Sequence, residues 1–336
     1  MPPSPHPNSA YTVGWISALP IEMAAAKGML DEEHGDPQNP PQQADDNTYL
    51  LGCIGYHKVV VACLPKHEIG SSSAAAVAKD MLFTFPNIRI GLLVGIGGGI
   101  PNCDGGDDEP DIRLGDVVIS SDKTNGGVVV YDFGKRLGDG SFEPVYALDR
   151  PPRPLRTALA RLETEHKTRD NRISEYILRM LEKYPYMKKK GFVHPGQGND
   201  MLFQVDYQHK GGKSCTTCDR EKLTKREPEN RPDTNPEIHY GIIATGSSVV
   251  KHAPTREEIR QQHKAICLEM EAAGLMNNFP CLVIRGISDY ADSHKNDKWH
   301  MYAAATAAAC AKELLEYVQP RDVDETRTVK EVLNQG

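Results

Sequence analysis

The stretch IRIGLLVGIGGG, from Ile88 to Gly99, decides the fold, because it joins a continuous apolar run to a cluster of glycines. Ile88 to Val94 has the length and apolar content of a strand that is buried on both faces, and we expect Gly95 to Gly99 to form a turn after it. Strands without polar alternation are typical of parallel sheets covered by helices. The stretch therefore predicts a central strand of an α/β domain, with a ligand site where the strand ends.

The segments on either side of this strand alternate between strand and helix patterns in the same way. The predicted strands are Tyr11–Ala18, Thr48–Tyr56, Lys58–Leu64, Asp116–Ser121, His239–Ala244, Ala265–Met270 and Cys281–Ile287. The predicted helices are Ile21–Leu30, Ser71–Phe85, Glu271–Asn277 and Met301–Val318. This alternation predicts one α/β domain over residues 11–320 with a largely parallel sheet.

A polar, proline-rich insertion at about residues 135–237 interrupts the α/β pattern. It contains one amphipathic helix around Leu155–Lys183, and residues 210–237 are predicted to form an ordered loop or a partly mobile flap. Residues 1–10 are expected to be a disordered tail, and residues 321–336 a charged tail or linker.

Charge and composition exclude several classes of protein. The chain has 39 basic and 46 acidic residues, a net charge of −7, so no overall positive field attracts nucleic acid or a membrane surface. No apolar run approaches the roughly 18 residues of a membrane span, and no secretory signal is visible. The eight cysteines are scattered, which favours reduced core residues over a disulfide framework. We expect a cytoplasmic protein that binds neither nucleic acid nor membranes.

Four predicted strand ends carry residues with catalytic chemistry. They are Glu22, the glycine cluster, the pair Glu269 and Glu271 inside an apolar run, and the segment from Arg285 to Asp289. Each has a structural alternative: a helix-dipole partner for Glu22, an ion pair with Arg285 for the two glutamates, and an N-cap for Asp289. The glycine cluster lacks the Gly-Lys-Ser/Thr of a Walker A loop, and Ile100 stands where a dinucleotide fingerprint has its third glycine.

Taken together, the order and spacing of six motifs resemble the purine nucleoside phosphorylase/uridine phosphorylase superfamily. Within it they are most similar to the methylthioadenosine/S-adenosylhomocysteine nucleosidases and fungal purine nucleosidases, which occur alone or as N-terminal domains of larger receptor-like proteins. The motifs are VGWISALPIE (13–22), VGIGGG (94–99), LGDVV (114–118), ATGSS (244–248), LEMEAA (268–273) and RGISD (285–289). The resemblance implies a three-layer α/β/α domain with a twisted mixed central sheet, no cofactor, and a homodimer or higher homo-oligomer.

The resemblance also implies roles for individual residues. Glu22 activates a water molecule with Arg285 nearby, Asp289 protonates purine N7 with the help of Ser288, and Glu271 with Met270 holds the ribose. The backbone of Gly95, Ile96 and Gly97 lines the nucleophile pocket, and Ser248, Val249 and Val250 line the base. These residue types suit a glycosidic cleavage, because an oxocarbenium-like transition state needs an acid for the leaving group and a base for water. Asp289 is expected to be protonated near neutral pH through desolvation.

The nucleophile pocket distinguishes hydrolysis from phosphorolysis. A phosphate dianion needs cationic partners, yet neither Ser17–Ala26 nor Leu92–Pro101 contains a basic residue, and the Glu22 carboxylate repels phosphate. The sequence therefore predicts a purine nucleosidase, with adenosine favoured over inosine or guanosine as substrate. The alternatives are a purine nucleoside phosphorylase, and an AMP or ATP nucleosidase that serves as the effector or sensing module of a larger protein.

Departures from the family pattern lead to three further expectations. Val249 and Val250 replace a base-stacking aromatic residue, so Phe203 in the insertion, together with Tyr207, is predicted to form a lid over the purine. Lys66 and His67 could meet a 5′-phosphate or form an exposed loop. His209, Cys215, Cys218 and His239 have the residue types of a zinc site, but a single CxxC pair is a weak pattern and no metal is assigned from it.

Overall fold

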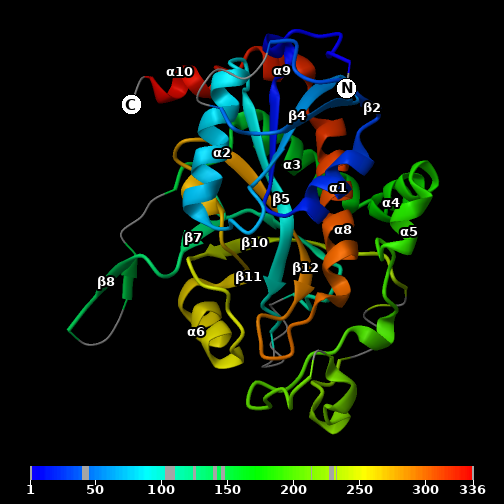
Figure 1. Ribbon diagram of the computed structural model, residues 1–336. Helices are drawn as coiled ribbons and strands as arrows, with labels where there is room; N and C mark the ends of the chain where they lie inside the picture. Colours follow the sequence, from blue (N-terminus) through cyan, green and yellow to red (C-terminus); the bar gives the residue numbers. More distant parts are fainter. Residues whose placement is uncertain are drawn as a thin grey trace.

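The computed structural model describes residues 2–39, 45–102, 110–123, 126–138, 142–144, 148–212, 214–226, 231 and 233–334. Its central strand β5 (Ile90–Gly99) lies between β1 (Val13–Ser17) and β12 (Cys281–Asp289), and it is parallel to both. All three strands are almost fully buried, as their continuous apolar runs predict. Because they run parallel, their carboxyl ends meet at one edge of the sheet (Figure 1).

The glycine cluster differs from its prediction, because Gly95 to Gly99 continue the strand instead of forming a turn. The glycines are needed for close packing. A Cβ on Gly95 would lie 2.4 Å from Glu22 Oε1 and 2.5 Å from Arg285 Nη1, and one on Gly97 would lie 2.6 Å from the Cys267 sulfur. The missing side chains therefore let two charged groups approach the strand backbone.

The remaining strands complete one large sheet among the described residues. They are β2 (Glu32–Glu33), β3 (Tyr49–Ile54), β4 (His57–Cys63), β6 (Val117–Ser120), β7 (Val128–Val130), β10 (Ile238–Thr245) and β11 (Ala265–Glu269). The order is β11-β10-β6-β12-β5-β1-β4-β3-β2, with β7 beside β10. The β12–β6, β3–β4 and β2–β3 pairs are antiparallel, so the sheet is mixed. Strand β11 also pairs with the end of β5, which curls this side of the sheet towards closure.

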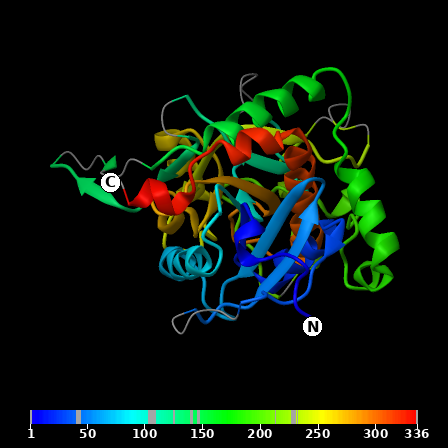
Figure 2. The same cartoon turned by 90° about the horizontal axis from the view of Figure 1, so that it is seen from above.

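Helices cover both faces of the sheet and form the expected three layers (Figures 1 and 2). One core lies under α1 (Pro20–Met29), α3 (Arg153–His166), α4 (Ile173–Lys183) and α8 (His300–Tyr317). The opposite core lies under α2 (Ser71–Thr84) and α7 (Ala272–Leu275). The alanine-rich α8 packs directly on β12, since a Cβ on Gly286 would lie 1.9 Å from the Ala303 carbonyl oxygen.

Two helical segments differ from the sequence predictions. The single helix predicted over Leu155–Lys183 is broken into α3 and α4 where Asn171 accepts a hydrogen bond from the Ile173 N–H. Helix α6 (Ala253–His263) was not predicted. In its described part, the segment 210–237 is a loop, with short 3₁₀ turns at Cys215–Thr217 and Arg220–Lys222 and an isolated β-bridge between Leu223 and Phe203. The other elements of the insertion are α5 (Pro185–Lys189), the 3₁₀ turn η2 (Gln197–Asn199) and the hairpin β8 (Gly134–Arg136) and β9 (Phe142–Pro144).

Both ends of the chain pack against the domain, in contrast to the tails expected there. Near the start, Ser4 is buried and its hydroxyl lies 2.8 Å from the Tyr11 hydroxyl. Near the end, α9 (Pro320–Asp324) and α10 (Val329–Leu333) follow α8, and Val323 and Val329 are buried in the two cores. Burial of these apolar side chains explains why the C-terminal segment packs against the domain although it is rich in charged residues.

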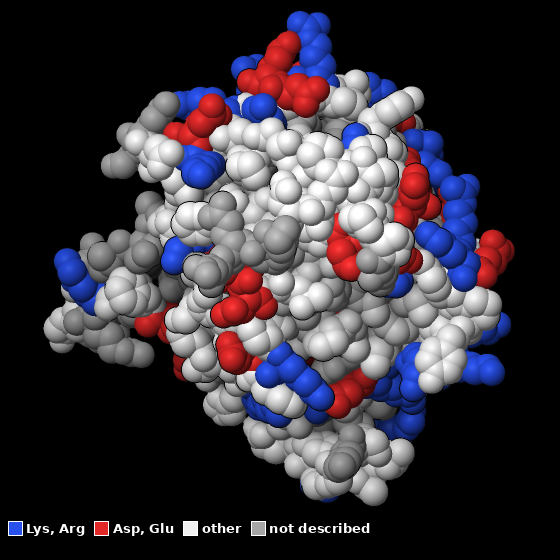
Figure 3. Space-filling model, turned by 45° about the horizontal axis from the view of Figure 1, so that its top comes forward, with Lys and Arg blue, Asp and Glu red and all other residues white. Residues whose placement is uncertain are grey.

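The surface agrees with the charge balance of the sequence. On the face that Figure 3 shows, acidic and basic side chains are interspersed around a large uncharged area, and no continuous basic surface is visible there. Among the described residues, no helix has the length and apolar content to cross a membrane.

Candidate active site

A cavity of about 250 Å³ opens where β5, β11 and β12 end. Most of the predicted site residues line it, although they come from distant parts of the chain. They are Glu22, Ile96, Gly97, Ser248, Val249, Val250, Met270, Glu271, Arg285, Ser288 and Asp289. The topology explains this convergence, because the carboxyl ends of neighbouring strands meet at the same edge of the sheet.

Glu22 lies in the first turn of α1 and is buried. One carboxylate oxygen accepts hydrogen bonds from the N–H groups of Ala18 (2.7 Å) and Leu19 (2.9 Å), and the other accepts one from Ile96 N–H (2.8 Å). Burial raises the pKa of Glu22 above its ordinary value, while the charge of Arg285 and the backbone donors act in the opposite direction. The carboxylate is thus fixed in orientation and its proton affinity is increased, which suits a general base.

Arg285 is the buried cation at the centre of the site. Its Nη2 donates to the carboxylates of Glu269 and Glu271, the latter at 3.2 Å. Glu269 also accepts hydrogen bonds from the backbone N–H groups of Glu271 and Ala272. Glu269 is therefore a positioning residue that orients both Arg285 and the start of α7. The ion pair between Arg285 and the two glutamates, which the sequence analysis gave as the structural alternative, is present.

Glu271 projects into the cavity from the end of β11. Its Oε1 accepts a hydrogen bond from the Gly70 N–H at 3.2 Å. Burial is the largest cause of a rise in the pKa of Glu271 to about 7, to which Glu269 and Glu22 add against the opposing charge of Arg285. A carboxyl group with this pKa can accept hydrogen bonds from hydroxyl groups or donate one near neutral pH.

Asp289 ends β12, where its carboxylate has three partners. The Ser288 hydroxyl donates to Oδ2 at 2.9 Å, the Ala291 N–H donates to Oδ1 at 2.9 Å, and the ammonium group of Lys295 lies 2.9 Å from Oδ2. The Ser288 contact agrees with the predicted orienting role. The Lys295 ion pair was not foreseen and places a second proton donor at the cavity.

The opposite wall of the cavity is open. Residues 246–252 follow β10 without helix or strand structure, and the side chain of Val249 is 47% exposed. The Ser248 carbonyl oxygen accepts a hydrogen bond from the Tyr131 hydroxyl at 3.2 Å. Met270 also lines the cavity, together with Leu268 and Glu269. A planar ligand can therefore enter between this segment and the buried carboxylates.

Several predicted residues lie elsewhere. The ring of Phe203 does not line the cavity, because it is buried and stacks on His294 with ring centroids 4.0 Å apart, so the predicted lid contact with the purine is absent from this structure. Lys66 and His67 are exposed in the loop before α2 and do not line the cavity. Gly95 lies directly behind it, against Glu22.

Three polar lining residues were missed by the sequence analysis: Lys251, Lys295 and His300. All lie on loops or at the first residue of a helix, where no apolar pattern marks them. His300 Nε2 is buried and has no hydrogen-bond partner within the described part of the chain, and burial lowers the pKa of its imidazole. An unpartnered nitrogen beside the cavity is suited to a ligand contact.

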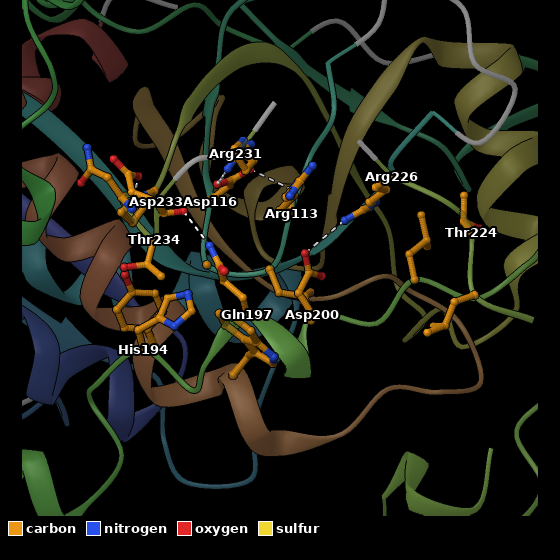
Figure 4. A pocket seen from close by; sticks show the side chains of 18 residues that line it. Arg113, Asp116, His194, Gln197, Asp200, Thr224, Arg226, Arg231, Asp233 and Thr234 are labelled. Atoms are coloured by element: carbon orange, nitrogen blue, oxygen red, sulfur yellow. Dashed lines mark hydrogen bonds and ion pairs between the residues drawn. The ribbon is translucent and has the colours of Figure 1, made fainter. Parts of the chain in front are cut away.

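A second cavity, of about 320 Å³, lies between the insertion and β6 (Figure 4). Its side chains form ion pairs: Arg231 with Asp116, and Arg226 with Asp200. Asp116 also accepts a hydrogen bond from His239, which explains why this histidine is not near the cysteine pair. Burial alone would raise the pKa of Asp116, but these two hydrogen-bond donors hold it at about 2. These contacts fasten the insertion to the sheet.

The chain is similar to several known proteins. Residues 191–318 match the family model of the phosphorylase superfamily. A nucleotide-binding leucine-rich repeat (NLR)-like protein of Hyaloscypha variabilis is 42% identical over 95% of the chain, and an ATP nucleosidase, Cap17, of Escherichia coli is 35% identical over 90%. The chain spans 30% and 50% of these relatives, respectively. The solved 5′-methylthioadenosine/S-adenosylhomocysteine nucleosidase of Helicobacter pylori has the same fold, with a TM-score of 0.56 and 16% identity over 92% of this chain and 99% of that one.

Proposed function

Because the chain belongs to the phosphorylase superfamily, we propose that it is a purine nucleosidase, which hydrolyses the N-glycosidic bond between a purine base and ribose. One observation carries the proposal. Glu22, a buried carboxylate fixed by three backbone N–H groups, lines the same cavity as Asp289 and Glu271.

The reaction follows from the chemistry of these three carboxyl groups. Glu22 accepts a proton from a water molecule while the water oxygen attacks C1′ of the ribose. The bond between C1′ and purine N9 breaks, and its electron pair stays on the base. Asp289 in its acid form, which can receive its proton from the adjacent Lys295 ammonium group, protonates the base at N7. Glu271 accepts hydrogen bonds from the ribose hydroxyls and stabilises the positive charge that develops on the sugar. The products are the free base and ribose.

The charges of the cavity favour water over phosphate as the nucleophile. The cation nearest to Glu22 among the described lining residues is Arg285, and its guanidinium is already paired with Glu269 and Glu271. A phosphate dianion would therefore meet a carboxylate and a neutralised arginine. Water carries no charge and can donate a hydrogen bond to Glu22.

A nucleotide is the second candidate substrate. Lys251 and Lys295 line the cavity beside the acidic groups and could meet a phosphate ester. The relative named as an ATP nucleosidase supports the same reading. The base would leave by the same steps, with ribose 5-phosphate or its triphosphate as the second product.

The test is incubation of the purified protein with adenosine, inosine, AMP and ATP, with and without phosphate, followed by chromatography of the products. We expect free base without added phosphate, and we expect Glu22→Gln to lower kcat by about 10² to 10⁴-fold, because an amide cannot accept the proton from water. Asp31→Asn, an exposed change outside the cavity, is the matched control. Base release that requires phosphate and yields a sugar 1-phosphate would refute hydrolysis.

A further inference from the structure

The insertion contains a small cluster whose only buried hydrophobic side chains are Phe203, Cys215 and Cys218, within the part of the chain that the structure describes. Met201, Tyr207 and Leu223 pack against it. A core of this size buries too little apolar surface to order a segment without strand or helix support, and small units of this kind usually need a disulfide or a metal ion.

Three potential metal ligands meet at this cluster. The ligand atoms of His209, Cys215 and Cys218 all lie within 4.8 Å of one another. His209 Nδ1 is 3.2 Å from the Cys218 sulfur and 3.9 Å from the Cys215 sulfur. Tetrahedral zinc with Zn–S of about 2.3 Å and Zn–N of about 2.05 Å requires S···N separations of about 3.6 Å, which lies between these two distances.

The local hydrogen bonds orient the three ligands as a metal site requires. His209 Nε2 lies 3.2 Å from the Gly212 carbonyl oxygen and donates to it, so Nδ1 keeps a lone pair directed at the two sulfurs. The 3₁₀ turn Cys215–Thr217 brings both thiols to the same side, with the Cys218 N–H bonded to the Cys215 carbonyl oxygen. Both cysteines are buried.

His294 is the fourth residue at this place. It is 6% exposed, and its ring lies 5.5 Å from that of His209. Its Nδ1 lies 3.6 Å from an Asp292 carboxylate oxygen, beyond hydrogen-bond distance, and among the described residues neither ring nitrogen has a hydrogen-bond partner. Its carbonyl oxygen is 3.7 Å from the Cys215 sulfur. A buried imidazole without a hydrogen bond is costly, and coordination of an ion would give one of its nitrogens a partner.

We propose that His209, Cys215 and Cys218 bind a structural zinc ion, and that His294, whose nitrogens lie outside the 4.8 Å group of the other three, turns its imidazole towards the ion as the fourth ligand. Thiolate and imidazole ligands in a closed tetrahedral set select zinc among the common divalent ions, and a closed set has no position for substrate. The ion itself takes no part in the reaction at Glu22.

The ion would join the insertion to the loop that carries the catalytic acid. His294 lies five residues after Asp289, and the His209 N–H donates to the Ser293 hydroxyl at 3.0 Å. A small cavity is lined by Cys215, His294, Lys295 and Asp289 together. Zinc binding therefore fixes the segment that places Lys295 against Asp289, and its removal loosens that segment.

The experiment is metal analysis of the protein, purified without chelators, by mass spectrometry, together with its melting temperature before and after dialysis against a chelator. We expect about one zinc ion per chain, a lower melting temperature after its removal, and recovery when Zn²⁺ alone is added back. Cys218→Ser and His209→Ala should each lose the zinc. The matched control is Cys53→Ser, because Cys53 belongs to the other group of possible ligands, with Glu32 and His34, and should leave the zinc content unchanged.

Two results would overturn the proposal. One is a metal-free protein whose denatured form lacks two titratable thiols, because Cys215 and Cys218 would then form a disulfide. The other is an equal zinc content in wild type and Cys218→Ser, which would place the ion elsewhere. His294→Ala tests the fourth ligand separately: it should lower zinc affinity by about 10 to 100-fold or more, and an unchanged affinity would remove His294 from the set.

Discussion

Replacing Glu271 by Gln should destroy activity and yet stabilise the protein at alkaline pH. The pKa of Glu271 is raised to about 7, chiefly by burial and further by Glu269 and Glu22, against the charge of Arg285. A glutamate has a pKa of about 4.5 when unfolded. The folded state therefore prefers the protonated group. The free energy of unfolding that the protonated Glu271 contributes is fully present below about pH 4.5 and is lost as the pH rises through about 7.

The magnitude follows from this difference of about 2.5 pKa units, which corresponds to about 3 kcal/mol above pH 8 and to less than 1 kcal/mol at pH 5. Glutamine carries no titratable charge and avoids this loss. It keeps an oxygen for the Gly70 N–H, but its amide faces Arg285 as a donor, which costs about 1 kcal/mol at every pH. The difference in free energy of unfolding between the variant and wild type should therefore shift by about 2 to 3 kcal/mol in favour of the variant between pH 5 and pH 8.

Thermal unfolding at pH 5 and pH 8 measures this gain. With an unfolding entropy of about 2 cal/mol/K per residue, the melting temperature of Glu271→Gln relative to wild type should rise by about 3 to 4 °C between the two pH values. Asp31→Asn is the matched control. Burial acts to raise the pKa of Asp31, but Lys312 and the Gly55 N–H lower it overall, so its stabilising contribution is already complete at pH 5 and the cost of removing it should be the same at both pH values.

The reasoning fails if the difference between Glu271→Gln and wild type is the same at pH 5 and pH 8. That result would mean that Glu271 is ionised throughout this range and that Arg285 compensates fully for its burial. Retention of wild-type turnover by the variant would separately refute the assignment of Glu271 to the ribose.

Two further outcomes follow from the packing. Gly95→Ala places a Cβ 2.4 Å from Glu22 Oε1, so it should lower kcat by at least about 10²-fold by displacing the base, with far-UV circular dichroism confirming the fold; normal turnover would show that Glu22 can move freely. Val329→Asp buries an unpaired carboxylate in the core under α2 and should destabilise the protein by about 3 kcal/mol in denaturant titration, whereas the same change at the exposed Val332 should cost less than about 0.5 kcal/mol. Equal effects at the two positions would mean that α10 does not pack against the domain.

The sequence predicts the central sheet well because its strands are buried on both faces. The segments around β1, β5 and β12 have continuous apolar runs, and the burial that these runs predict is the burial observed. The end of β5 was mispredicted because glycine normally indicates a turn. Here Gly95 and Gly97 remain in the strand to make room for side chains from α1, β11 and β12, which a local pattern cannot reveal.

In the site, too, residues within local motifs could be predicted, whereas residues placed by contacts between distant segments could not. Glu22, Glu271 and Asp289 were predictable because they stand in motifs at strand or helix ends, and the topology brings them to one cavity. Lys295 and His300 follow β12 in a loop and a helix start whose course depends on contacts with the insertion. Phe203 was assigned to the cavity because a base-stacking ring was needed there, but its ring packs on His294 instead. The need for an aromatic ring at the base does not identify the residue that provides it.

The buried charges also bear on the choice of nucleophile. Glu22, Glu269 and Glu271 surround one arginine, so the centre of the site carries an excess of negative charge when all three are ionised. The charge of Glu22 alone would repel a phosphate dianion about 4 Å away by about 8 kcal/mol at an effective dielectric constant of about 20. Arg285 opposes part of this repulsion, but its guanidinium is already paired with Glu269 and Glu271. Protonation of Glu22 would relieve this repulsion, and its raised pKa makes protonation easier. The protonated group, however, can no longer accept a proton from water. The ionised state that supports hydrolysis is therefore the state that excludes phosphate, and one carboxylate determines both properties.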